Sequence, residues 1–393
     1  MLVSFVFSLI VTILILYDPP SVRCELITVF KKGEAGYYCH KIPYLFVTLK
    51  NTLLALAEAR GKGQSSCNDF TGTDLVIKRS YDLGRTWSEL QVLISNSSTT
   101  EQNVVGNAAP VQDNAGRIWM PFCRNNEEIF IIYSDDDGML WSKPLALPHL
   151  VLDGWKWVGL GPPSGLKLST GRLLIPGYHT SLWKGDGCVS KAHTMYSDDN
   201  GQSWALGSVD FGDPYFPNEA QAVELKNGSI LINARTISTH RLQMRSDDGG
   251  ITFSPPWIVA DLIEPIEGCE GSFIRDAETD ILYYSGSYTN GVIRKNMTIL
   301  TSKDEGISWT VLVVVDKGAT SYSALAILDG SLETFTSSNH VSTIVGAVAS
   351  KTGTTMISRD NRGGKILALL YERSNSMNII FEPDEIVLYR FVL

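Results

Sequence analysis

One eight-residue pattern recurs five times along the chain, and it constrains the fold more than any other feature. Each copy reads Ser-x-Asp-x-Gly-x-Thr/Ser-Trp/Phe, and only the second departs from it, with Leu140 where Thr or Ser is expected. The copies start at residues 80, 134, 197, 246 and 302, so successive starts lie 49 to 63 residues apart. A repeat of this length is close to one four-stranded blade of a β-propeller.

The residue types of the repeat are those of a hairpin turn. Ser and Asp side chains bond the turn backbone, Gly adopts a conformation that other residues avoid, and the aromatic residue packs beneath the turn. Apolar runs such as residues 75–77 and 129–133 precede most copies. We therefore interpret the repeat as structural; the alternative is that Asp82 and its counterparts bind a ligand.

A second series of segments alternates with the first and sets the expected number of blades. Each is an apolar strand that follows a turn rich in Gly, Asn or Asp: 52–60, 117–123, 172–179, 229–235, 281–288 and 365–372. Six such strands with five repeats predict an all-β, six-bladed β-propeller. We expect the runs 26–30 and 386–391 to share one blade and close the ring, since closure protects exposed strand edges. Residues 25–393 then form a single domain.

The N-terminus indicates entry into the secretory pathway. Residues 2–16 are apolar, but the run is shorter than the ~20 residues of a membrane span, so we interpret residues 1–24 as a signal peptide. Because no Lys or Arg precedes the run, the alternative is an uncleaved membrane anchor. Such an anchor would be the one contact of the chain with a membrane. Glycosylation sequons at Asn96, Asn227 and Asn296 agree with secretion.

Charge and cysteine content exclude several classes of function. The net charge is -9 and no Lys/Arg-rich run is present, which excludes a nucleic-acid partner. The six cysteines have no metal-ligand spacing, so we expect no metal site. One or two disulfides fit an oxidising compartment.

Long polar side chains stand where several of the apolar strands end. They are Arg60, His179, Arg235 and Glu372. In a propeller such ends gather at one mouth of the central channel. Arginines converging there indicate an anionic ligand, because a guanidinium matches a carboxylate with two parallel hydrogen bonds.

The five repeats and these motifs together resemble the sialidase superfamily, and its lysosomal branch in particular, over about residues 26–393. The resemblance implies an exo-α-sialidase that retains configuration and requires no cofactor or metal. It further implies sialylated glycans as substrates, and a lysosomal or extracellular location.

The family holds the substrate carboxylate with three arginines, and the resemblance places two of them at Arg235 and Arg294. The third normally precedes Ile-Pro, and here Lys41 occupies that place. A lysine keeps the charge but loses the two-pronged hydrogen bond. Glu372 matches the carboxylate that orients the first cation, and Arg60 matches a further substrate-contacting arginine.

The resemblance also assigns the reacting groups: Tyr322 matches the nucleophile, Glu219 its base and Asp69 the general acid, with Asp74 as the local alternative. A neutral phenol suits a substrate whose reacting carbon bears a carboxylate, because an anion ~4 Å away would be repelled by about 4 kcal/mol at an effective dielectric near 20. Since the phenol pKa is near 10, a base is required.

Weaker assignments follow from neighbouring positions. Trp155 and Trp157 precede 161–165, a loop that resembles the one near the family's N-acyl pocket, although both could be packing residues. We expect His179 to be a hydrogen-bonding residue of the rim and not a catalyst. Two cysteines that flank Lys41 and Asp69 imply a Cys39–Cys67 disulfide; the alternative is that both are free and buried.

Two other functions use much of the same site. A lectin-like propeller would bind sialic acid without cleaving it, but it would need none of Asp69, Glu219 and Tyr322. A trans-sialidase would use the same residues and differ only in the acceptor that enters, so the sequence leaves it open.

Overall fold

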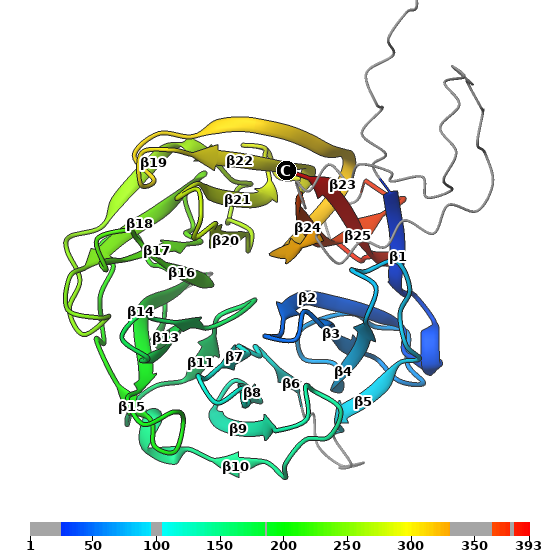
Figure 1. Cartoon of the computed structure of the whole chain (residues 1–393), viewed down its shortest axis with the longest axis horizontal. Helices are drawn as coiled ribbons and strands as arrows, with labels where there is room; N and C mark the ends of the chain where they lie inside the picture. The colour runs from blue at the N-terminus through cyan, green and yellow to red at the C-terminus, as the bar shows by residue number, and fades with distance from the viewer. Residues whose placement is uncertain (1–24, 96–103, 185–186, 331–363, 378–380) are drawn as a thin grey trace, which may run out of the picture.

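The structure is a computed structural model, and it describes residues 25–95, 104–184, 187–330, 364–377 and 381–393. The expected signal peptide and the sequon at Asn96 lie outside the described residues. Figure 1 shows the sheets standing side by side in a ring around a central opening, which confirms the all-β, propeller-like prediction.

Four of the sheets follow one another along the chain, and their strands pair antiparallel. The first contains, in spatial order, β2 (Cys39–Val47), β3 (Leu53–Arg60), β4 (Thr73–Ser80) and β5 (Gln91–Ile94). The second contains β10 (Leu145–Ala146), β9 (Glu128–Ser134), β8 (Ile118–Arg124) and β6 (Val105–Gly106), with β7 (Val111–Gln112) also on β8. The third contains β11 (Trp157–Leu160), β13 (Leu173–Lys184), β14 (Gly187–Ser197) and β15 (Ala205–Leu206), with β12 (Leu166–Lys167) on β13. The fourth contains β16 (Ala220–Glu224), β17 (Ile230–Ala234), β18 (His240–Ser246) and β19 (Trp257–Ile263).

The fifth sheet is larger and unites the two ends of the described chain. Its order is β1 (Glu25–Lys31), β25 (Glu385–Val392), β24 (Lys365–Ser374), β23 (Thr310–Asp329), β22 (Lys295–Ser302), β21 (Leu282–Ser287) and β20 (Ser272–Arg275). β1 pairs antiparallel with β25, which confirms the predicted pairing of the N- and C-terminal runs. The sequence did not predict the continuity of this sheet. It arises because β23 pairs with β22 up to Ala319 and with β24 from Ala319 onward.

The recurring turns are structural, as predicted. In the first, the Ser80 hydroxyl donates to Asp82 Oδ1 at 2.8 Å and accepts the Gly84 N–H at 2.8 Å. Gly84 has φ +86°, and a Cβ there would meet a Leu388 methyl at 2.3 Å, so glycine is required. In the second copy, the Leu140 N–H still donates to Asp136 Oδ1 at 2.8 Å, and for that reason the copy tolerates the loss of its hydroxyl.

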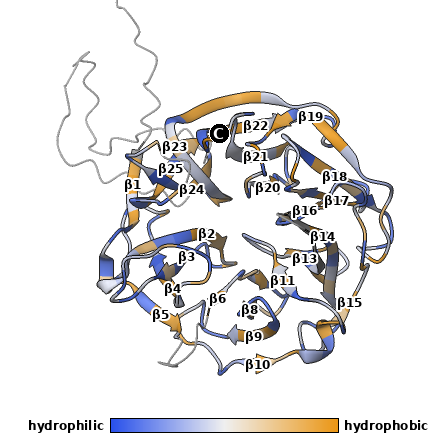
Figure 2. Cartoon of the chain, turned by 180° about the vertical axis from the view of Figure 1, so that it is seen from behind, coloured by the Kyte–Doolittle hydropathy of each residue, from blue (hydrophilic) through white to orange (hydrophobic). Residues whose placement is uncertain are grey.

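The apolar core lies between neighbouring sheets. One cluster joins β3 to β23 and β24 and contains several small side chains: Ala55, Ala57, Ala324, Ala326 and Ala368. Apolar residues also reach the outside, as Figure 2 shows for the first half of β23, where Val311, Leu312 and Val314 are exposed. None of the helices in the described part of the chain has the length and apolar character of a membrane span.

Candidate active site

Two adjoining pockets contain nearly all of the predicted site residues. The first is lined by five of them: Arg60, Asp69, Glu219, Arg235 and Tyr322. The second is lined by Lys41 and Arg294, and Asp69 belongs to both. Glu372 lines neither pocket and is fully buried. The residues that the sequence places at separate strand ends therefore lie around one connected depression.

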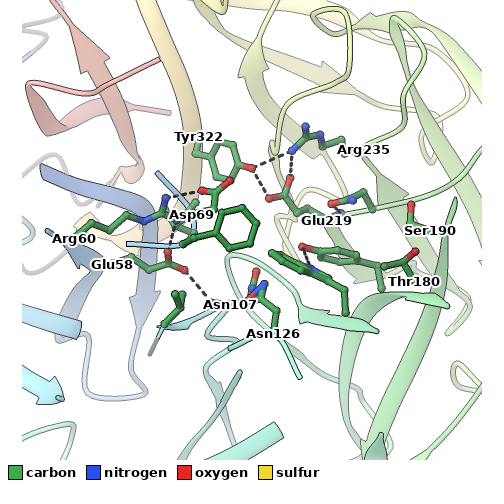
Figure 3. Close-up of a pocket in the computed structure, with 16 residues that line it drawn as sticks. Glu58, Arg60, Asp69, Asn107, Asn126, Thr180, Ser190, Glu219, Arg235 and Tyr322 are labelled. Carbon is green, nitrogen blue, oxygen red and sulfur yellow. Dashed lines mark hydrogen bonds and ion pairs between the residues drawn. The ribbon is translucent and has the colours of Figure 1, made fainter. Parts of the chain in front are cut away.

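Tyr322, Glu219 and Arg235 form a closed hydrogen-bonded group (Figure 3). The Tyr322 hydroxyl donates to Glu219 Oε1. Arg235 Nη1 donates to Glu219 Oε2 at 2.7 Å and to the Tyr322 oxygen at 3.0 Å. Glu219 directly precedes β16 and Arg235 directly follows β17, whose pairing sets these two next to each other. A carboxylate is thus in place to accept a proton from the phenol.

The surroundings of Tyr322 keep its phenol neutral. Burial raises the pKa of Tyr322 well above its ordinary value, and the charge of Glu219 raises it further. Arg235 and Arg294 act in the opposite direction but do not overcome the burial. The phenol therefore carries no charge in the free protein, which is the form that the sequence predicts for it.

β-Bulges present two of the site residues. Between Thr320 and Ser323 of β23, the pair Ser321 and Tyr322 opposes the single residue Glu372 of β24. A bulge leaves its extra residue unpaired and redirects the side chain, a device common beside active sites. It takes the Tyr322 phenol out of the sheet ladder and into the pocket.

The second bulge is in β2, directly after Lys41. Lys41 pairs with Glu58 and Tyr44 with Leu56, so Ile42 is in the bulge. Ile42 has φ 53°, the left-handed region, which is rare for a β-branched residue and costs about 1–3 kcal/mol. Contacts with the surrounding structure must offset this cost, and one of them is the hydrogen bond from the Ile42 N–H to Glu372.

Glu372 contacts the residue after Lys41 and not Lys41 itself. Its Oε1 accepts the Ile42 N–H at 2.8 Å, and its Oε2 has no hydrogen-bond partner in the described part of the chain. Among the described residues, the Lys41 ammonium forms neither an ion pair nor a hydrogen bond. Burial and then Arg60 lower the pKa of Lys41, while Glu372 opposes them. The Lys41 side chain therefore lines the second pocket with its amino group available to a ligand.

Asp69 is on the loop between β3 and β4, where Arg60 holds it. Arg60 Nη1 donates to Asp69 Oδ1 at 2.5 Å, and Arg60 Nη2 donates to Glu58 Oε2 at 2.6 Å. Burial would raise the pKa of Asp69, but the charges of Arg60 and Lys41 outweigh it, and the pKa lies below its ordinary value. The alternative acid, Asp74, is buried, accepts a hydrogen bond from Tyr37 at 2.5 Å and lines neither pocket.

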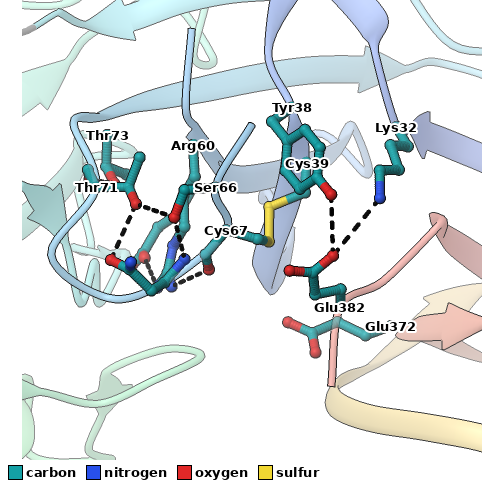
Figure 4. Close-up of a disulfide and its surroundings, with 12 residues drawn as sticks. Lys32, Tyr38, Cys39, Arg60, Ser66, Cys67, Thr71, Thr73, Glu372 and Glu382 are labelled. Carbon is teal, nitrogen blue, oxygen red and sulfur yellow. Dashed lines mark hydrogen bonds and ion pairs between the residues drawn. A yellow bond between two sulfur atoms is a disulfide. The ribbon is translucent and has the colours of Figure 1, made fainter. Parts of the chain in front are cut away.

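The loop of Asp69 is fastened by the predicted disulfide. Cys39 of β2 and Cys67 are bonded, with Cα atoms 5.9 Å apart (Figure 4). The prediction is confirmed, and the alternative of two free thiols is wrong. Cys123 and Cys269 are free and buried. The disulfide ties the strand of Lys41 to the loop of Asp69.

Of the residues assigned less firmly from the sequence, one lines a pocket and two do not. Trp157 lines the first pocket, whereas Trp155 stacks on the His179 ring with centroids 3.8 Å apart. His179 is buried and hydrogen-bonds Asp210 at 2.8 Å and His193 at 3.2 Å. The predicted hydrogen-bonding role of His179 is confirmed, but its place on the rim is wrong, because the ring is buried against Trp155 and lines neither pocket.

Sequence reasoning missed several pocket residues. Glu58 had a signal, since it stands two positions before Arg60 on the same face of β3. It accepts hydrogen bonds from Arg60 and, at 3.0 Å, from the Asn107 N–H. Other residues of the first pocket come from loops and from the interiors of β13 and β14, without a recognisable motif: Phe70, Val104, Asn107, Asn126, Tyr178, Thr180, Ser190 and Asn218.

Comparison with known proteins identifies the family. The model of the BNR repeat-like domain matches residues 43–333, nearly three quarters of the chain. The chain belongs to this family. It is a member of the sialidase superfamily, as the following relatives show.

This superfamily member is 30% identical to Sialidase-3 of Rattus norvegicus over 279 residues, which are 63% of this chain and 65% of the rat protein. It is 29% identical to a sialidase of Micromonospora viridifaciens over 333 residues, 75% of this chain and 49% of that one. Among solved structures, the Hadza microbial sialidase Hz136 superposes with a TM-score of 0.70 at 21% identity, over 91% of this chain and 66% of that one. The chain thus spans about two thirds or less of the length of these relatives.

Proposed function

We propose that this chain is a retaining exo-α-sialidase that hydrolyses terminal sialic acids from glycoproteins, glycolipids or oligosaccharides. The observation that carries the proposal is the contact of the Tyr322 phenol with Glu219, with Asp69 lining the same pocket. The superfamily membership and the sialidase relatives support it.

In the first half-reaction the Tyr322 oxygen attacks the anomeric carbon. Glu219 takes the phenol proton, and Asp69 gives its proton to the glycosidic oxygen as the bond to the leaving glycan breaks. In the second, Asp69 removes a proton from water, the water oxygen attacks the same carbon, and Tyr322 leaves and recovers its proton from Glu219. Two displacements at one carbon retain the configuration.

The cations bind the carboxylate of the substrate. Arg235, Arg294 and Lys41 supply three positive charges around the two pockets, and Arg60 supplies a fourth beside Asp69. When the substrate carboxylate neutralises Lys41 and Arg294, part of the positive charge that keeps Asp69 ionised is removed. Substrate binding then favours the protonated acid that the first step requires.

The same proposal extends to the architecture. We divide the seven-stranded sheet at Ala319 of β23 into two blades of four strands. One contains β20 to β22 and the first half of β23, and the other contains the second half of β23 with β24, β25 and β1. With the four remaining sheets this makes six blades in one domain, residues 25–393.

We place the mature protein in the lysosome or outside the cell, after removal of residues 1–24.

The test is release of 4-methylumbelliferone from its α-sialoside between pH 4 and 7, with Tyr322→Phe as the inactive control. Release by the wild type and not by the variant is expected. Binding of sialic acid without release would replace the proposal with a lectin-like function. Lactose is added in a parallel reaction, since formation of sialyllactose would indicate trans-sialylation.

A further inference from the structure

Glu270 is a buried carboxyl beside the site that has no role in the mechanism above. It directly precedes the Gly271–Ser272 step into β20, and its side chain is fully buried. Its Oε2 accepts the Ser323 N–H at 2.9 Å, and its Oε1 has no hydrogen-bond partner in the described part of the chain. Ser323 directly follows Tyr322, so Glu270 contacts the backbone that carries the phenol.

The need for such an acceptor comes from the way β23 changes partners. Beyond Ala319 no strand of the described part of the chain pairs with the edge of β23 that faces away from β24. On this edge the Ser323 N–H donates instead to Glu270, and the Leu325 N–H donates to the Ser272 hydroxyl at 2.9 Å. A buried N–H left without an acceptor costs about 1–3 kcal/mol, so these side chains take the place of a strand.

Glu270 acts on the bulge from its C-terminal side. The bulge consists of Ser321 and Tyr322, and Ser323 is the first residue back in register with β24. On the N-terminal side, the Thr320 N–H donates to the Arg294 carbonyl at 3.2 Å. The backbone of Tyr322 is therefore held on both sides by contacts to other segments.

The segment that carries Glu270 is hydrogen-bonded to β18. The fully buried Arg241 donates to the Cys269 carbonyl at 2.8 Å and to Glu264 Oε2 at 3.2 Å. Because Cys269 directly precedes Glu270, the backbone next to Glu270 is tied to β18. A contact from Glu270 therefore links β23 to β18 through Cys269 and Arg241.

We propose that Glu270 is a positioning residue for the nucleophile: by accepting the Ser323 N–H it fixes the bulge that aims the Tyr322 hydroxyl at Glu219. A misplacement of about 1 Å can cost on the order of a hundredfold in rate. The inference rests on the proposed function for its kinetic consequence. The property of Glu270 that matters is its acceptor oxygen and not a negative charge. Burial raises the pKa of Glu270 well above its ordinary value, and Glu219 raises it further, although the Ser323 N–H acts in the opposite direction.

Two substitutions separate an acceptor from a charge. Glu270→Asp keeps the carboxyl but withdraws it by about 1.5 Å, the length of one carbon–carbon bond, so it no longer reaches the Ser323 N–H. Glu270→Gln removes the acid but keeps a carbonyl oxygen in place. Asp276→Asn is the matched control, because Asp276 is a buried carboxylate that accepts a backbone N–H, from Glu278, at the other end of β20.

The variants are compared by kcat and KM on the 4-methylumbelliferyl sialoside, and by the rate at which a 2,3-difluoro sialic acid labels Tyr322. Glu270→Asp is expected to lower kcat and the labelling rate by about tenfold or more, with KM within about twofold. Glu270→Gln and Asp276→Asn are expected to stay within about threefold of the wild type. A charge role predicts the reverse order of Asp and Gln, and that order would overturn the inference, as would equal rates for all three.

Hydrogen–deuterium exchange provides a readout independent of activity. The peptide containing Ser323 should exchange faster in Glu270→Asp than in the wild type, and at the wild-type rate in Glu270→Gln. Unchanged exchange in Glu270→Asp would overturn the inference. If the wild type released no sialic acid, the proposed function would fail, and the exchange rates would still decide whether Glu270 holds the bulge.

Discussion

Glu219 Oε1 accepts a hydrogen bond from the Tyr322 hydroxyl although 103 residues separate the two in sequence. Glu219 stands at the start of the fourth sheet and Tyr322 on the strand that links both parts of the fifth. The pair forms only when the ring brings these sheets together. Any change that loosens the ring should therefore separate the proposed nucleophile from its base.

Replacing Tyr322 with Phe should abolish turnover while leaving the fold intact. The change removes one hydroxyl, and Glu219 retains Arg235 at 2.7 Å, so the stability cost should be about 1 kcal/mol. Turnover is measured with the aryl sialoside and stability by thermal unfolding. A variant with more than about a tenth of the wild-type kcat would exclude Tyr322 as the nucleophile.

Asp69→Asn should impair natural glycosides more than aryl ones. A sugar leaving group needs a proton, and the expected loss in kcat/KM is about 10²- to 10⁴-fold, whereas an acidic phenol leaves with little assistance. Because the pKa of Asp69 in the free protein lies below its ordinary value, hydrolysis of sialyllactose by the wild type should decline as pH rises above the acidic range. Equal losses on sialyllactose and the aryl sialoside would contradict the role of acid.

Lys41 should act through substrate affinity. Its ammonium faces the second pocket without a partner among the described residues, so Lys41→Ala should raise KM about tenfold or more and change kcat little. Lys41→Arg should keep or lower KM, since a guanidinium offers two parallel hydrogen bonds. The exposed Lys226, paired with Asp280, provides the control variant Lys226→Ala. If Lys41→Ala had the wild-type KM, Lys41 would not bind the substrate carboxylate, and only Arg235 and Arg294 would remain as its cations.

His40 should make stability depend on pH. Its ring is buried with both nitrogens unpaired in the described part of the chain, and burial lowers its pKa to about 4, with Lys78 lowering and Glu34 raising it. The unfolded chain takes up the proton near pH 6.5, so the contribution is present above that pH and is lost as pH falls toward 4. From pH 7 to 4.5 the free energy of unfolding should fall by about 2 kcal/mol through His40 alone.

Urea titrations of the wild type and His40→Leu at the two pH values measure this difference. The leucine variant should lose less stability on acidification than the wild type, whatever its stability at pH 7. An unchanged difference between the two pH values would show that His40 does not contribute.

The sequence by itself determined the repeated turns, because the bonds within them are short-range. Ser80, Asp82 and Gly84 bond one another within five residues, so the repeat could be recognised and its structural role predicted without knowing any neighbour. The apolar runs at both ends predicted the pairing of β1 with β25. The motifs that resemble those of sialidases predicted that Asp69, Glu219 and Tyr322 share one site, and all three line one pocket.

Only the tertiary structure decided where individual side chains point. Glu372 was expected to hold Lys41, yet it bonds the Ile42 N–H, because a bulge turns that N–H toward β24. His179 was expected on the rim, yet its ring is buried against Trp155. No sequence motif marked Glu270, because its proposed role depends on the Ser323 N–H of β23, which donates to Glu270 and not to a neighbouring strand. Whether a backbone N–H is free depends on strands far away in sequence, and no local pattern records it.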